Sequence, residues 1–205
     1  MLAAFTASLL LITVSELGDK TFFIAAILAM RHRRRWVFAG AVGALALMTL
    51  ISVLVGQAAT LLPTAWVKWA EVSLFIIFGI NLLYQASQMT ATGTEEQDAA
   101  EAVNKAEQGT RKPKETPLAI MAEAFGLTFV AEWGDRTQIA TIALAAANPS
   151  LGVISGAILG HAICAAIATN CGRWLCGRVS ERALTALGGG LFLLFGSLAL
   201  LMPQA

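Results

Sequence analysis

Long apolar segments alternate with short polar breaks along this chain. Six segments are mostly apolar and at least about 20 residues long, the length that a helix needs to cross the hydrocarbon core of a bilayer. They occupy residues 2–30, 36–58, 66–88, 117–146, 150–172 and 182–201. The pattern therefore predicts an all-α membrane protein with six transmembrane helices.

One polar segment is much longer than the other breaks. Residues 90–116 mix acidic and basic side chains, which predicts a solvated linker with some helix around 95–108. This linker divides the chain into two three-helix units, residues 1–89 and 117–205.

Composition agrees with a membrane protein. Hydrophobic residues make up 57% of the chain and charged residues 13%, whereas soluble domains average about 25% charged residues. The lipid bilayer is thus an expected partner. Nucleic acid is not, because no basic cluster is interleaved with aromatic residues. The three cysteines show no metal-ligand spacing.

The loop charges predict how the chain is oriented. Lys20 and Arg136 lie deep in the apolar segments, and eleven of the other twelve basic residues fall in or beside alternate loops, on one predicted side. Because basic loops stay in the cytoplasm, we expect linker 90–116 to be cytoplasmic and both termini to be periplasmic or extracellular.

The two halves contain the same motif. Glu16-Leu17-Gly18-Asp19-Lys20-Thr21 matches Glu132-Trp133-Gly134-Asp135-Arg136-Thr137 at a shift of 116 residues. Gly40 and Gly56 meet Gly156 and Gly172 at the same shift. Each half has an odd number of predicted spans, so the halves should be inverted repeats, a topology typical of secondary transporters.

Four acidic residues fall near the middle of the predicted spans: Glu16, Asp19, Glu132 and Asp135. Charged groups are costly at membrane depth, so a functional site is the default hypothesis. Residues three apart share a helix face, and four converging carboxylates suit a hard cation such as Mn²⁺, Ca²⁺ or Mg²⁺. The intervening glycines, Gly18 and Gly134, permit close packing or a local break in the helix.

Other polar residues are candidates for supporting roles. Thr21, Thr137 and Gln138 could add neutral oxygen ligands, while Lys20 and Arg136 could act as opposite gates. Four acids and two bases leave two negative charges, which one divalent cation or two protons would neutralise. Outside the motif, Glu123 could line an access path, although placement at the membrane interface explains it as well. His161 could relay protons, although an interhelical hydrogen bond is the alternative explanation.

These features resemble a known family. The paired motif, the six spans and the acidic central loop are similar to the cation/proton exchanger family that contains Golgi manganese/calcium transporters and bacterial manganese exporters. The resemblance implies export of Mn²⁺, or Ca²⁺, from the cytoplasm in exchange for protons. It also implies that Glu16, Asp19, Glu132 and Asp135 are the metal ligands. The short loops suggest a bacterial inner-membrane protein.

Alternative functions remain at this point. An exporter of a small organic solute, such as an amino acid, would need a larger pocket and fewer converging acids. A membrane enzyme is not expected, because no nucleophile–base pattern occurs, and no resident cofactor is predicted. A non-transporting scaffold would tolerate Asn or Gln in place of the acids. The sequence leaves open whether the protein is a homo-oligomer.

Overall fold

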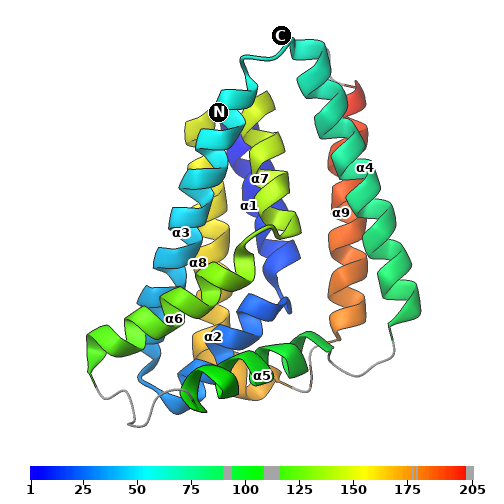
Figure 1. Ribbon diagram of the computed structural model, residues 1–205. Helices are drawn as coiled ribbons and strands as arrows, with labels where there is room; N and C mark the ends of the chain where they lie inside the picture. Colours follow the sequence, from blue (N-terminus) through cyan, green and yellow to red (C-terminus); the bar gives the residue numbers. More distant parts are fainter. Residues whose placement is uncertain (90–93, 109–115, 177, 179, 202–205) are drawn as a thin grey trace.

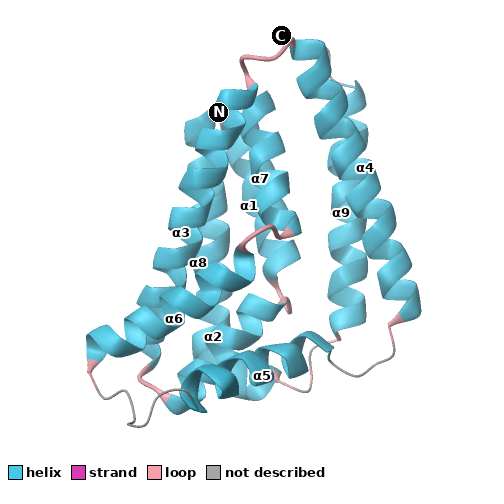
Figure 2. Cartoon of the chain, viewed as in Figure 1, coloured by secondary structure: helices cyan, strands magenta, loops and turns pink. Residues whose placement is uncertain are grey.

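The computed structural model describes residues 1–89, 94–108, 116–176, 178 and 180–201, and within these ranges the chain is helical with short loops (Figure 2). The helices are α1 (Leu2–Glu16), α2 (Lys20–Arg31), α3 (Arg34–Ala59), α4 (Thr64–Gln88), α5 (Thr94–Gln108), α6 (Pro117–Glu132), α7 (Arg136–Ala147), α8 (Ser150–Leu175) and α9 (Glu181–Leu201). The prediction of an all-α protein is confirmed, and α5 is the helix expected in the linker. Arg111, Lys112 and Lys114 of the linker lie outside the described residues.

Four helices, α3, α4, α8 and α9, are long and apolar enough to cross a membrane. Helices α1 and α2 together could form a fifth span that bends by 64° at its break. The predicted fourth span is also divided, into α6 and α7, and the two do not meet the same criterion as a pair. Four to five spans are therefore supported among the described residues, against the six expected from the sequence.

Both divided spans break at the glycine of the acidic motif. Gly18 has φ 78° and Gly134 has φ 83°, values that a residue without a Cβ adopts at little cost. The residue before each glycine is extended, and the aspartate after it is the N-cap of the next helix. Of the two effects considered for these glycines, the local break is the one that occurs.

Packing contacts in the first half recur in the second with matching partners. A Cβ on Gly40 would overlap Met121 and Ala124, while a Cβ on Gly156 would overlap the residues that correspond at a shift of 116, Phe5 and Ser8. Gly79 likewise packs on Leu193, and Gly196 packs on Ile76. The side chains of the two halves thus meet through equivalent positions.

Helices α4 and α9 pack against each other, and the pair contacts the rest of the bundle through α7 and α1 (Figure 1). At their interface the rings of Phe75 and Phe192 meet edge to face, with centroids 5.7 Å apart. Helix α5 lies across one end of the bundle, and the chain begins at the opposite end (Figure 1).

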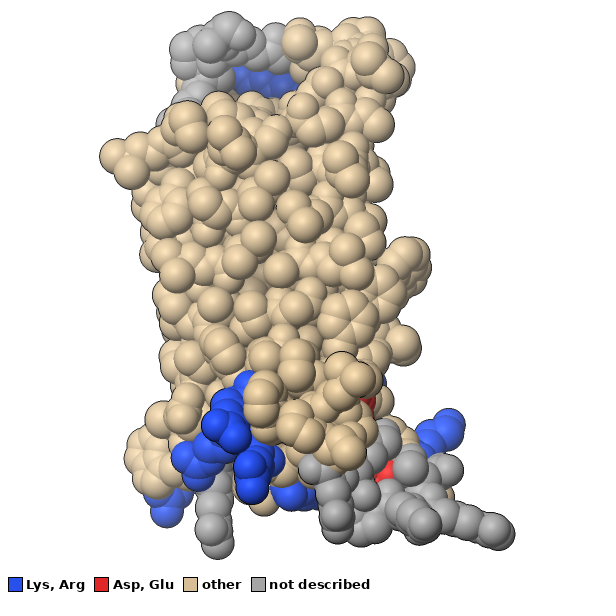
Figure 3. All heavy atoms as spheres, turned by 90° about the vertical axis from the view of Figure 1, so that its left-hand side faces the viewer, with Lys and Arg blue, Asp and Glu red and all other residues tan. Residues whose placement is uncertain are grey.

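Charged side chains are confined to the ends of one broad face. Figure 3 shows the side that lies to the left in Figure 1, with a wide band free of charge and most of the visible Lys and Arg gathered at the α5 end. Such a band is what a protein surface in contact with lipid requires.

Candidate metal site

The four motif acids lie at the two helix breaks. Glu16 ends α1 and Glu132 ends α6, and their exposed fractions are 2% and 3%. Asp19 and Asp135 are the N-caps of α2 and α7. Because each helix pair breaks between its glutamate and its aspartate, the backbone carries both carboxylates to the ends of helices. The shared helix face expected from the i, i+3 spacing is therefore not how the acids meet.

Three of the four acids converge. Glu16, Glu132 and Asp135 each offer a carboxylate oxygen, and these oxygens lie within 4.8 Å of one another. The group combines residues from both copies of the motif. One oxygen of each glutamate, Oε1, is buried and has no hydrogen-bond partner among the described residues. Buried acceptors without donors are costly, so these oxygens are suited to hold a cation or a proton.

The motif threonines hold the glutamates in place. The Thr21 hydroxyl donates to Glu16 Oε2 over 3.2 Å, and the Thr137 hydroxyl donates to Glu132 Oε2 over 3.3 Å. The Thr137 hydroxyl also lies 3.1 Å from Asp135 Oδ2. With one glutamate oxygen held in each copy, the other is free to face a ligand.

Asp19, the fourth acid, pairs with the basic residue of the other motif. Its Oδ1 lies 3.5 Å from Nη2 of Arg136, whose Nε is 3.8 Å from Asp135 Oδ1. Arg136 thus lies between aspartates of both copies. Lys20, its sequence equivalent, instead lines a separate cavity between α2, α5 and α6, so the two bases are not placed symmetrically.

The remaining candidates lie at different places. Gln138 Oε1 accepts a hydrogen bond from the Gly134 backbone N–H over 2.7 Å and so stabilises the second break. Glu123 is buried, lies 3.8 Å from Nε2 of His32, and lines the same cavity as Lys20. His161 is buried in α8, and its Nδ1 has no hydrogen-bond partner in the described part of the chain.

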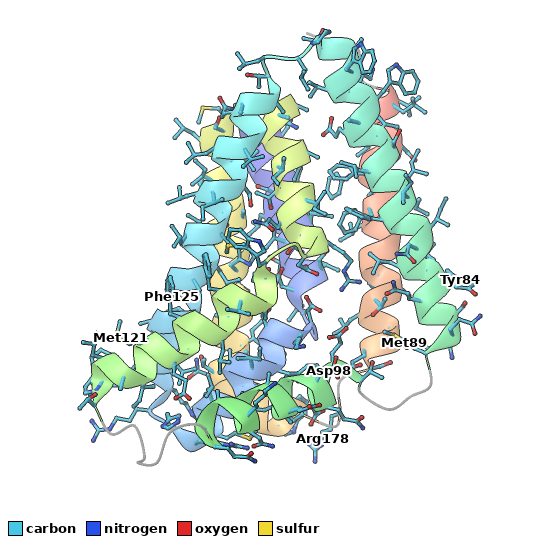
Figure 4. All side chains as sticks on the ribbon, in the orientation of Figure 1. Tyr84, Met89, Asp98, Met121, Phe125 and Arg178 are labelled. Atoms are coloured by element: carbon cyan, nitrogen blue, oxygen red, sulfur yellow. The ribbon has the colours of Figure 1, made fainter. Side chains whose placement is uncertain are left out.

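A second cavity lies between the first break and α5, and no sequence pattern indicated it. Its lining includes Asp19, Arg136 and Glu95, a residue placed in the solvated linker by its polar surroundings. Burial raises the pKa of Glu95 above its ordinary value, although Arg136 opposes the rise. Met89 and Asp98, labelled in Figure 4, mark the end of α4 and the helix α5 that border this region.

Glu181 is another functional candidate that the sequence did not indicate. Its carboxylate accepts hydrogen bonds from the backbone N–H groups of Glu95 and Glu96, over 3.3 and 3.2 Å. A carboxylate from α9 therefore caps the N-terminus of α5, a contact between segments 85 residues apart that no local pattern announces.

Comparisons with known proteins show which family the chain belongs to. The model of the family described as "Divalent cation/proton antiporter GDT1" matches residues 4–90 and 120–204, which leaves out most of the linker. GDT1-like protein sll0615 of Synechocystis sp. is 59% identical over 199 residues, covering 95% of each chain. Protein PAM71-homolog, chloroplastic, of Arabidopsis thaliana is 40% identical, covering 95% of this chain and 58% of its own.

A third relative, GDT1-like protein 3 of Oryza sativa subsp. indica, is 42% identical, covering 94% of this chain and 71% of its own length. No solved structure matches the chain significantly. The family match covers both copies of the acidic motif and the helices around them, and its members are transporters. This chain therefore belongs to the GDT1 family of divalent cation/proton antiporters.

Proposed function

We propose that this protein exports Mn²⁺ from the cytoplasm in exchange for protons, with Ca²⁺ as the second candidate cation. The observation that carries the proposal is the group of carboxylate oxygens from Glu16, Glu132 and Asp135, which lie within 4.8 Å of one another at the junction of the two motifs. Neither copy supplies this group alone, so the ion would be shared between the halves.

The donor set favours a hard cation. Carboxylate and hydroxyl oxygens surround the site, and such ligands suit Mn²⁺, Ca²⁺ and Mg²⁺. Oxygens on opposite sides of Ca²⁺ lie up to about 5 Å apart, given Ca–O distances of 2.3–2.6 Å. Oxygens that lie within 4.8 Å of one another can therefore be bridged by a cation of this size. The preference for Mn²⁺ rests on the family resemblance.

The same oxygens would account for proton coupling. Buried carboxylates that lose a divalent cation must be neutralised in another way, and protonation is the direct one. The motif carries four acids and two bases, so two protons would replace one divalent cation. A single site that binds either the divalent cation or the protons, but not both together, would therefore move metal and protons in opposite directions.

Alternating access between two inverted three-helix repeats, with six spans in all, is the proposed mechanism. It is supported by the equivalent contacts of Gly40 and Gly156, of Gly79 and Gly196, and by the paired breaks at Gly18 and Gly134. The pair α4–α9 contacts α1 and α7, and a cavity reaches the site from the α5 side. In the opposite state of the transport cycle, the pair α4–α9 would move toward α2 and α6, the other halves of the two broken spans.

The proposed setting is a bacterial inner membrane with linker 90–116 in the cytoplasm. It is supported by the basic side chains at the α5 end of the charge-free band (Figure 3). The cavity beside α5 would then open toward the cytoplasm, where a cation bound for export must enter.

Proteoliposomes containing the purified protein and a pH-sensitive dye provide the test. Mn²⁺, Ca²⁺ and Mg²⁺ are applied in turn, and the rate of proton movement is recorded for the wild type, Asp19→Asn and Asp135→Asn. We expect Mn²⁺ to drive proton movement in the wild type and both variants to lose it. Metal transport that ignores the pH gradient would reject coupling, and full activity of both variants would reject the site.

A further inference from the structure

The cavity between the first break and α5 places a linker side chain beside the transport site. It is lined by Glu95 of α5, by Asp19 and Arg136 of the motifs, and by side chains of α4 and α9 that include Leu82 and Leu184. Its volume of about 30 Å³ holds roughly two water molecules. Among the residues that line this cavity, Glu95 is the acidic residue contributed by α5.

Helix α5 is fixed to the bundle at both ends. At its beginning, the Glu181 carboxylate accepts from the backbone N–H groups of Glu95 and Glu96. Near its end, Arg31 of α2 donates to Asn104 Oδ1 over 2.8 Å and forms an ion pair with Glu107. The position of the Glu95 side chain is therefore set by the fold, even though the helix belongs to a polar linker.

Packing along α5 supports the same conclusion. Ala99 and Val103 are fully buried in the cluster formed around α2. The two residues are one helical turn apart, so one face of α5 rests on the bundle. Glu101 lies between them in sequence and is exposed, which gives the helix an outer, solvated face as well.

Arg136 is shared by carboxylates on both sides of it. It lies 3.5 Å from Asp19, interacts electrostatically with Glu95, and has its Nε 3.8 Å from Asp135. A guanidinium carries one positive charge, whereas a divalent cation carries two. An arriving cation can therefore replace Arg136 beside Asp19 and Glu95, and Asp135 then remains as a partner for Arg136.

We propose that Glu95 is a recruiting ligand for the transported divalent cation. The cation binds first between Glu95 and Asp19, displacing Arg136 from Asp19, and then passes to the oxygens of Glu16, Glu132 and Asp135. The buried Ser15 hydroxyl, which lines the same cavity and has no hydrogen-bond partner among the described residues, offers one more oxygen on this route. This inference rests on the proposed transport function.

The small cavity fits a partly hydrated ion. A hydrated divalent cation can make its first contact through one or two carboxylates while it keeps part of its water, as Mg²⁺ usually does in proteins. The cation needs to exchange its remaining water for protein ligands only at the shared site formed by Glu16, Glu132 and Asp135. Glu95 would therefore increase the rate of loading from the α5 side and leave the final affinity little changed.

The test compares Glu95→Gln with Glu101→Gln, which removes the same charge from an exposed position on the same helix. In proteoliposomes, the half-saturating Mn²⁺ concentration is measured separately for Mn²⁺ supplied at the α5 side and at the opposite side. We expect Glu95→Gln to raise it about tenfold at the α5 side only, and Glu101→Gln to change neither. Glu95→Asp should recover part of the loss.

Equilibrium Mn²⁺ binding by the purified proteins completes the experiment. Glu95→Gln should keep the wild-type Kd and melting temperature, which shows that the fold and the shared site are intact. Equal half-saturating concentrations for Glu95→Gln and Glu101→Gln, or equal losses at both sides, would overturn the recruiting role. If the wild type itself shows no Mn²⁺-driven proton movement, the proposed function fails instead, so the two failures are distinct.

Discussion

Arg136 of the second motif lies 3.5 Å from Asp19 of the first, so the two copies of the motif are joined by an ion pair. The side chain of Arg136 is 29% exposed and that of Asp19 is 10% exposed. The ion pair thus places a positive charge on one side of the cluster formed by Glu16, Glu132 and Asp135. A cation that arrives from α5 would meet this charge first.

Replacing this arginine should strengthen metal binding. Arg136→Gln removes a positive charge beside Asp19 and Asp135, and we expect Mn²⁺ to bind about tenfold more tightly, or ~1.4 kcal/mol. The melting temperature should rise more on addition of Mn²⁺ than it does for the wild type. Isothermal titration and thermal unfolding in detergent measure both quantities.

Lys20→Gln is the matched comparison, because Lys20 is the equivalent residue of the first motif and lines a different cavity. Its effect on Mn²⁺ affinity should be much smaller. Weaker binding by Arg136→Gln would mean that the arginine organises the acids and does not compete with the cation.

The motif threonines should differ in importance. Thr137 contacts both Glu132 and Asp135, whereas Thr21 contacts Glu16. Each hydrogen bond to a carboxylate contributes about 1.5–3 kcal/mol, so Thr137→Val should weaken Mn²⁺ binding more than Thr21→Val. Serine at either position should restore most of the affinity, since the hydroxyl returns.

Thr141→Val is the control for this series. Thr141 is buried in α7 but donates to the Thr137 backbone carbonyl, and it contacts no motif carboxylate in the described structure. Mn²⁺ titrations of the wild type and of the three valine variants check the order of their affinities. A loss for Thr141→Val as large as that for Thr137→Val would indicate a general disturbance of α7.

The second break should require glycine. Gly134 has φ 83°, and a Cβ built on it meets no atom within 4 Å. Gly134→Ala therefore tests backbone strain alone, which costs about 1–2 kcal/mol for an L-residue in this conformation. Melting temperature and Mn²⁺ affinity should both fall, because the strain acts between Glu132 and Asp135.

Gly126→Ala separates this strain from the general effect of alanine. Gly126 lies in α6, where a Cβ also meets open space but the backbone is helical. Alanine is the better helix former by about 1 kcal/mol, so this variant should be neutral or more stable. A drop in stability equal to that of Gly134→Ala would contradict the role given to the backbone conformation.

Close helix packing should fail when Gly156 is enlarged. A Cβ there would overlap Ser8 and the Phe5 carbonyl oxygen of α1, and overpacking of this kind costs about 1–3 kcal/mol. We expect Gly156→Ala to lower the melting temperature in detergent. Gly190→Ala, at a position with no atom within 4 Å, should not.

The sequence by itself determined the helical class and the residues proposed for the site. Apolar length predicted six spans, of which four are continuous helices in the structure, and the repeat of Glu-x-Gly-Asp singled out the four candidate acids. These conclusions are local: they depend on the hydropathy of about 20 residues at a time and on the cost of charge at membrane depth. Helix α5 was also predicted from local composition.

Only the tertiary structure decided which groups meet. Spacing predicted four equivalent acids, but three converge and Asp19 pairs with Arg136. Glu95 reaches the site region because Glu181, from a helix distant in sequence, caps α5. Such contacts depend on how whole helices pack and where they break, and neither hydropathy nor spacing within one segment contains that information.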